Sequence, residues 1–410
     1  MRIFKLNFTY YSSFSFYYIN NYYICNNYVS LKQYIMTTNN PFVVGKYISD
    51  EYFCDRVQET AILIKHIKNG RNVALISPRR LGKTGLIEHL FHNPEIEDNY
   101  QTFFVDIYST GSVAELAYVL SREIISKLKP KNEWRKKFFS IVKSISVGLK
   151  VEPITGELVF DLGLGDIKTP LTTLDEIFEY LEQSTAPCLV AIDEFQKIAK
   201  YKEKNVEELL RTKIQRCKKT TFIFSGSERN LMSAMFNSSA KPFYQSAISM
   251  GLEPIPLDVY SEFVQRHFSL RNKKIQKVVI SKVYDKFDGC TWFIQMIMNE
   301  LFSLTDHQGT CEEHMLKEAY TNIIMSQEHS YLEMLSLLAP IQKTVLQAIA
   351  KEGIAENLTS AEFIKKYNLR SASSVQSAVK GLLKTDILTK TAKGYRVYDY
   401  FFADWLKNKY

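Results

Sequence analysis

The chain of 410 residues lacks the cysteine patterns and the long apolar segments that mark several classes of protein. Its six cysteines are scattered, none forms a CxxC pair, and none lies near histidines at the spacing of a zinc site. We therefore expect reduced, buried thiols in a cytoplasmic protein. Every apolar run is too short to span a bilayer, so we expect no membrane association.

Residues 1–35 lack acidic side chains altogether, yet they contain twelve Phe or Tyr. Asn and Ser interrupt their apolar runs, and the segment lacks the compact apolar region and cleavage site of a secretory signal. The residues that follow Met36, TTNNPFVVGKYISDEYF, are typical of the start of a soluble domain. We therefore expect the native fold to begin at Met36, with residues 1–35 a mis-assigned start.

What the chain does have is enough apolar sequence for ordinary packed cores, at 46% hydrophobic residues. Its length predicts two or three domains. The net charge of +8 is mildly basic, which permits a polyanionic partner without requiring one.

Strand and helix patterns alternate after Met36. Short apolar runs at residues 72–77, 101–109, 187–193 and 220–227 are typical of buried parallel strands. Helical periodicity separates them at residues 56–69, 83–93, 113–128, 173–184 and up to about residue 218. Residues 140–166 interrupt this rhythm and predict an inserted β-hairpin. The pattern as a whole predicts an α/β fold with a largely parallel sheet.

A phosphate-binding loop is the most specific motif of the chain. Residues 77–84, SPRRLGKT, fit GxxxxGK[ST] except at the first position, and they lie between a predicted strand and a predicted helix. In such a loop the backbone N–H groups and the helix N-terminus point at the phosphates. The Lys83 ammonium would neutralise the β- and γ-phosphates, and the Thr84 hydroxyl would bind Mg²⁺. The predicted nucleotide-binding residues are Ser77, Pro78, Arg79, Arg80, Leu81, Gly82, Lys83, Thr84 and Gly85.

An acidic pair follows a second buried strand in the sequence CLVAIDEF. In a P-loop protein, Asp193 would hold the magnesium ion and Glu194 would polarise an attacking water. The next predicted strand ends in FIFSGS, and neighbouring strands of a parallel sheet end at one edge. Ser225 or Ser227 is therefore a candidate sensor of the γ-phosphate, although an ordinary polar strand end is an open alternative.

These motifs together resemble the archaeal-type AAA-ATPase-like proteins, within the STAND group of P-loop NTPases. The resemblance rests on SPRRLGKTGL, AIDEFQKI, FIFSGSERNLMSAMF and KPFYQS, and it spans roughly residues 40–410. It implies an AAA+-like ATPase with a helical lid and a C-terminal winged helix, and it implies that Arg56 lies near the adenine end of the nucleotide. The Gly-x-Pro motif of the lid departs from the pattern, since Thr291 replaces proline in GCTW.

The last part of the chain predicts three helices followed by two short strands with a Lys-Gly turn, the pattern of a winged helix-turn-helix. Residues 340–410 hold twelve Lys or Arg against six Asp or Glu, so most of the basic charge lies here. The predicted recognition helix places a polar face where a major groove would be read. That face comprises Ser371, Ser373, Ser374, Gln376, Ser377, Lys380 and Lys384. Packing against the ATPase core or against a partner protein is the alternative.

The sequence thus predicts a P-loop ATPase core over residues 36–255, with the hairpin near 140–166, a helical lid over 256–335 and a winged-helix domain over 336–410. We expect a Mg²⁺-dependent ATPase that acts as a nucleotide-driven switch, with Lys83 and Glu194 as catalytic residues. ATP and Mg²⁺ are the expected ligands, and a protein partner or homo-oligomer is possible. An ATP-dependent DNA-binding regulator is the alternative, and a small-molecule phosphotransferase is a third hypothesis.

Overall fold

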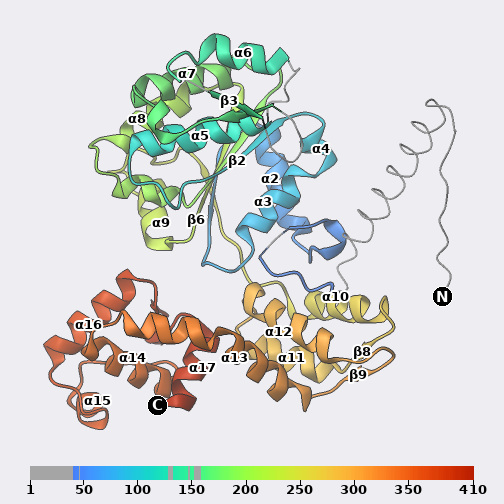
Figure 1. Cartoon of the computed structure of the whole chain (residues 1–410), viewed down its shortest axis with the longest axis vertical. Coiled ribbons are helices and arrows are strands. Elements are labelled where there is room, and N and C mark those ends of the chain that lie inside the picture. Colours follow the sequence, from blue (N-terminus) through green and yellow to red (C-terminus); the bar gives the residue numbers. More distant parts are fainter. Residues whose placement is uncertain (1–39, 46, 128–132, 146–147, 152–157) are drawn as a thin grey trace, which may run out of the picture.

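The structure is a computed structural model that describes residues 40–45, 47–127, 133–145, 148–151 and 158–410. The expected mis-assigned start, residues 1–35, lies outside the described residues. The described chain forms an α/β core, a group of helices beneath it, and a C-terminal helical unit beside that group (Figure 1). Within the described residues, every helix is too short or too polar to cross a membrane.

A parallel sheet with the strand order β2-β5-β6-β1-β7 forms the centre of the core. Four of its strands match the predicted apolar runs, and their bounds are β1 (Val73–Ile76), β2 (Gln101–Asp106), β5 (Cys188–Asp193) and β6 (Thr220–Gly226). The fifth strand, β7 (Ile248–Met250), has no counterpart in the sequence prediction. It is a three-residue edge strand and is partly exposed, so it lacks the apolar run that revealed the others.

Alternating side chains of the strands point to opposite faces of the sheet, as the period of two requires. On β6, Ile223 packs with α2 and α3, whereas Phe222 and Phe224 pack with the helices of the other face. Because both faces are covered, β5 and β6 are buried along their whole length. This double covering explains why the strands are continuous apolar runs in the sequence.

The helices of the core largely follow the predicted periodicity. Their bounds are α2 (Val57–Lys68), α3 (Lys83–Phe91), α4 (Pro94–Glu97), α5 (Val113–Lys127), α6 (Glu133–Ile141), α7 (Pro170–Glu182), α8 (Val206–Arg216) and α9 (Arg229–Asn237), with the 3-10 turns η1 (Asp50–Tyr52), η2 (Leu164–Asp166) and η3 (Phe195–Lys200). The prediction of a single charged helix after the acidic pair is wrong. The structure has η3 and α8 instead, because Asn205, with φ of 61°, precedes a new helix. In the stretch 140–166, β3 (Gly148–Val151) and β4 (Leu158–Asp161) pair antiparallel.

The lid and the C-terminal unit lie below the core in Figure 1 and are joined by the long helix α13. The lid contains α10 (Leu257–Ser269), β8 (Lys274–Ile275), α11 (Lys277–Lys286), α12 (Thr291–Leu304), β9 (Thr310–Cys311) and α13 (Met315–Ser336). The C-terminal unit contains α14 (Pro340–Glu352), α15 (Ala361–Lys366), α16 (Ala372–Lys384), β10 (Leu388–Lys390), β11 (Tyr395–Val397) and α17 (Tyr400–Lys409).

Helix α17 corrects the prediction of three helices and a wing. Asp399 is its N-cap residue, and the Asp399 carboxylate accepts hydrogen bonds from the backbone N–H groups of Phe401 and Phe402. Its side chains Phe401, Phe402 and Trp405 are buried, and Phe402 and Trp405 pack against Tyr331 of α13. The lid and the C-terminal unit consequently share one continuous hydrophobic core.

Candidate active site

The predicted phosphate-binding loop connects β1 to α3 at the edge of the sheet that faces the lid. Gly82 has φ of 91° and directly precedes the first residue of α3. This left-handed conformation strongly favours glycine, which explains why the loop needs Gly82 there. The N-terminus of α3 therefore opens toward the loop, as anion binding requires.

Lys83 is the first residue of α3, and its side chain is only 7% exposed. Its ammonium donates to the carbonyl oxygens of Ser77 and Pro78, at 2.9 and 3.0 Å. Burial lowers the pKa of Lys83, whereas the carboxylates of Asp193 and Glu194 raise it. The ammonium is thus held inside the loop, by carbonyl groups that a phosphate would replace as its partners.

Asp193 ends β5 next to α3, and it is 8% exposed. Its Oδ2 accepts a hydrogen bond of 3.1 Å from the Thr84 hydroxyl. A hydroxyl and a carboxylate in contact, beside a phosphate-binding loop, are the hard oxygen donors that Mg²⁺ takes together with water and substrate phosphates. The two side chains therefore fit a magnesium ion.

Glu194 follows in the left-handed conformation, with φ of 55°, so its side chain departs in a different direction from that of Asp193. Its Oε2 accepts a hydrogen bond of 2.8 Å from Ser227 and another from the amide of Gln196. Of the two candidate sensors, the structure brings Ser227 to Glu194. Ser225 is fully buried beside Leu75 in the sheet, and its hydroxyl has no hydrogen-bond partner among the described residues.

Asp106 is a third carboxylate at this edge, which the sequence analysis missed. It ends β2 and pairs in register with Asp193. Burial raises its pKa, and repulsion from Asp193 and Glu194 raises it further. A signal was present, since the strand sequence QTFFVD ends in an acid just as CLVAID does.

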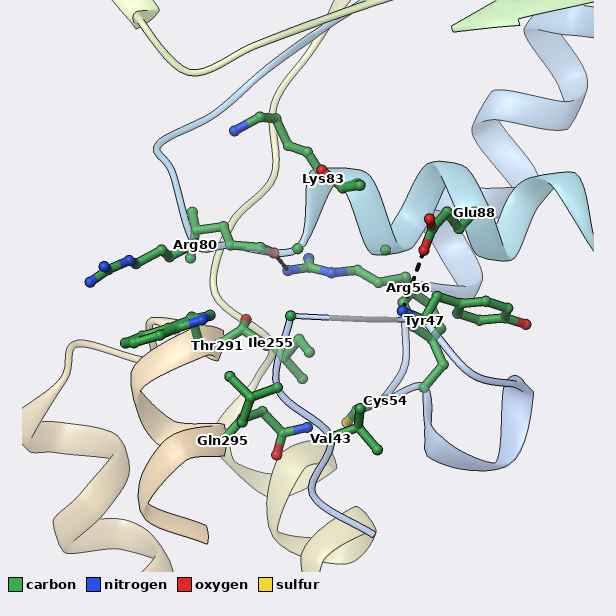
Figure 2. Close-up of a pocket in the computed structure, with 18 of the residues that line it drawn as sticks. Val43, Tyr47, Cys54, Arg56, Arg80, Lys83, Glu88, Ile255, Thr291 and Gln295 are labelled. Carbon is green, nitrogen blue, oxygen red and sulfur yellow. Dashed lines mark hydrogen bonds between the residues drawn. The ribbon is translucent and has the colours of Figure 1, made fainter. Parts of the chain in front are cut away.

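A cavity of about 350 Å³ lies between the phosphate-binding loop and the lid. Figure 2 shows α3 and the loop on one side of it, with Ile255, Thr291 and Gln295 on the other. Residues 79–85, Asp193 and Glu194 line the cavity, whereas Ser77 and Pro78 do not but bind Lys83. Other lining residues carry no sequence motif that predicts them, among them Val43, Val44, Gly45, Tyr47, Tyr260, Trp292 and Gln295.

Arg56 also lines the cavity, although it is 3% exposed. One end of its guanidinium pairs with Glu59 at 2.6 Å, and the other donates to the Leu81 carbonyl at 3.2 Å. Figure 2 shows its side chain running along the cavity toward the loop. Arg56 therefore supports the phosphate-binding loop from beneath.

The two arginines of the loop bind the C-terminal unit, a connection that the sequence did not reveal. Arg79 pairs with Asp386 and Arg80 pairs with Asp399, each at 2.9 Å. Arg80 also lies over the ring of Trp292, with its guanidinium carbon 4.1 Å from the ring centre. The loop is thus in direct contact with both the lid and the C-terminal unit.

The parallel sheet, the loop between β1 and α3, and the acidic pair at the end of β5 define the fold of a P-loop ATPase. Because β1 and β5 run parallel, with β6 between them, the loop and the acidic pair both lie at the carboxyl ends of the strands. The helical lid and a C-terminal winged helix complete the architecture, as the sequence predicted.

The comparisons with known proteins agree with this fold. Residues 329–408 match a family described as a probable winged helix domain. The Walker-type ATPase Paby2304 of Pyrococcus abyssi is similar over 90% of this chain and 99% of its own, with a TM-score of 0.61 and 20% identity. The ORC2 protein of Aeropyrum pernix, solved with ADPNP and ADP, is similar over 90% and 95%, with a TM-score of 0.55 and 15% identity. No curated protein sequence matches.

Proposed function

We propose that the protein is a Mg²⁺-dependent ATPase that works as a nucleotide-driven switch. The observation that carries the proposal is the convergence of Lys83, Thr84, Asp193 and Glu194 on one cavity large enough for a nucleotide. A cation at the N-terminus of a helix, a metal-binding pair and a carboxylate base beside them are the parts that phosphoryl transfer needs.

Each side chain has a distinct role in this proposal. Lys83 leaves the carbonyls of Ser77 and Pro78 and binds the β- and γ-phosphates. Thr84 and Asp193 would hold Mg²⁺, which neutralises the phosphate charge when bound. Glu194 accepts the proton of the attacking water.

The contacts of the phosphate-binding loop support the proposed switch. Arg79 and Arg80 hold carboxylates of the C-terminal unit in this structure. Phosphates compete with carboxylates for the same guanidinium groups. Nucleotide binding would therefore change the contact between the core and the C-terminal unit. We propose the division into a core over residues 36–255, a lid over 256–335 and a winged helix over 336–410 as the bodies that move.

Trp292 offers a direct test of the switch, because its ring stacks on Arg80. We expect Mg-ATP to change the tryptophan fluorescence of the protein as Arg80 turns from the indole toward phosphate. The Trp292→Phe variant, which keeps an aromatic ring beside Arg80, is the matched control and should lose most of that change. An equal change in this variant, or none in a wild-type protein that binds ATP, would contradict the switch.

DNA binding is the second candidate function, and the exposure of α16 favours it. On this helix Val375, Ala378, Val379 and Leu382 are buried. Its other side is exposed and includes Ser373, Gln376, Ser377, Lys380 and Lys384. A polar, basic helix face in a winged helix is a surface that a major groove can accept.

If this face binds DNA, the full chain should bind duplex DNA with an affinity that falls steeply with salt. Replacing both Lys380 and Lys384 by Ala should lower the slope of log K against log salt by about two, one for each lost phosphate contact. Fluorescence anisotropy with a labelled duplex measures both quantities. Replacing Lys407 and Lys409 of α17 gives a control of equal charge. The DNA function is rejected if the wild-type protein does not bind at about 50 mM salt, where phosphate contacts are strong.

A further inference from the structure

A series of contacts joins Glu194 to a carboxylate of the C-terminal unit more than 190 residues away in sequence. Asp386, in the turn that follows α16, accepts a hydrogen bond of 2.9 Å from Nη1 of Arg79. The Nε of Arg79 donates to the Ser227 hydroxyl at 3.2 Å. The Ser227 hydroxyl then contacts Oε2 of Glu194 at 2.8 Å.

The chemistry of these groups fixes the direction of each hydrogen bond. A guanidinium is a donor without acceptor sites, so Ser227 must accept from Arg79. The single hydroxyl proton of Ser227 is then directed to Glu194, whose carboxylate accepts it. Gln196 also donates to Oε2, so both bonds hold the same oxygen. Among the residues that the structure describes, the other oxygen, Oε1, accepts no hydrogen bond, so it can take a proton from water.

We propose that Asp386 is a positioning residue for Glu194, acting through Arg79 and Ser227, so that the docked winged helix sets the geometry of the catalytic base. This inference rests on the proposed role of Glu194 in ATP hydrolysis. It predicts that turnover depends on a side chain of the C-terminal unit that lines no part of the cavity.

The pair between Asp386 and Arg79 is poorly suited to a purely structural role. The two side chains are 54% and 29% exposed. Ion pairs at such exposure contribute little to stability, because water screens them. The pair instead fixes the guanidinium of Arg79 beside Ser227. A small displacement of this guanidinium would change the position of Glu194, the proposed base.

The structure also contains a matched control for the experiment. Asp399 pairs with the neighbouring Arg80, likewise at 2.9 Å and from the same unit. The guanidinium of Arg80 lies among the rings of Trp292, Phe293 and Tyr398. Weakening this pair disturbs the contact between the loop and the winged helix without touching the series of contacts that ends at Glu194.

The test is a double-mutant cycle on kcat for ATP hydrolysis. Asp386 has φ of 56°, a conformation that glycine adopts without strain, so Asp386→Gly removes the carboxylate and leaves the turn intact. We expect this variant to lower kcat roughly fivefold in the wild-type background, since misplacing a catalytic group slows the reaction. In a Ser227→Ala background it should change kcat by less than about twofold, because the connection is already broken.

Two further variants separate positioning from docking. Asp386→Asn keeps a hydrogen-bond acceptor in a residue that tolerates positive φ, and it should restore part of kcat. Asp399→Asn, which keeps the cap of α17, should change kcat by the same factor with and without Ser227, because its contact is independent.

The inference is overturned if Asp386→Gly leaves kcat unchanged, or lowers it equally in both backgrounds, while the activity still depends on Glu194. If the wild-type protein and Glu194→Gln release phosphate at the same rate above background, Glu194 is not the base and this inference loses its premise. If the wild-type protein releases no phosphate above background, the proposed function itself fails. A thermal melt of each variant verifies folding. If Asp386→Gly does not fold, Asp386→Asn replaces it in the cycle with Ser227→Ala. We then expect the effects of the two substitutions on kcat to be coupled. Additive effects would contradict the inference.

Discussion

Replacing Lys83 by Ala should weaken the binding of Mg-ATP by about 100-fold. The ammonium makes two charge-assisted hydrogen bonds to the carbonyls of Ser77 and Pro78, and the phosphates would replace both partners. Losing such bonds to a charged ligand costs about 3 kcal/mol in total, which corresponds to about two decades of affinity. Isothermal titration calorimetry of the two proteins measures the difference.

The control for this variant is Lys68→Ala, which removes a lysine of α2 that pairs with Glu95 at an exposed site. It lies outside the residues that line the cavity, so its affinity for Mg-ATP should match the wild-type value. Wild-type affinity in the Lys83 variant would mean that the nucleotide does not bind at this loop.

Replacing Glu194 by Gln should lower kcat by at least about 100-fold while the affinity for Mg-ATP stays within a few-fold of wild type. General base catalysis contributes about two to four decades of rate, and an amide cannot accept the proton. Gln has the same shape and can keep the contacts with Ser227 and Gln196 in altered form. Phosphate release under saturating ATP gives kcat, and calorimetry gives the affinity.

Glu228→Gln is the matched control, because Glu228 follows β6 at the same edge but pairs with Lys200 at an exposed site. Its kcat should stay close to wild type. If Glu194→Gln turns over ATP at the wild-type rate, Glu194 is not the base, and Asp106 becomes the next carboxylate to replace.

The parts of the fold that the sequence predicted are those encoded by local patterns. Strands β1, β5 and β6 are buried apolar runs because helices cover both faces of the sheet, whereas β2, at the edge of the sheet, is only partly buried. The phosphate-binding loop was recognisable because glycine, lysine and threonine are needed there at fixed spacing. Each of these signals lies within about ten residues of the chain.

The parts that the sequence missed depend on contacts between distant residues or on weak local signals. Strand β7 has three residues and an exposed edge, so it carries no apolar run. Helix α17 follows the wing directly, and its burial depends on Tyr331 of α13. The pairs of Arg79 with Asp386 and of Arg80 with Asp399 join residues 307 and 319 positions apart.

In the candidate site, too, the residues within local motifs were predicted, whereas those that depend on distant contacts were not. Asp193 and Glu194 were assigned from their place after a strand, and the structure puts both on the cavity with Lys83 and Thr84. The cavity wall formed by the lid was not predicted, because the replacement of proline by Thr291 removed the motif that marks it. The choice between Ser225 and Ser227 also needed the structure, since it depends on which hydroxyl reaches Glu194.

Phosphate release from ATP by the purified full chain, with Mg²⁺ present and with Mg²⁺ chelated, tests the central claim most directly. The arrangement of Lys83, Thr84, Asp193 and Glu194 predicts repeated turnover with Mg²⁺ and release at the background rate of the buffer without it. Release at the buffer rate under both conditions, by a folded protein with saturating ATP, would contradict the account.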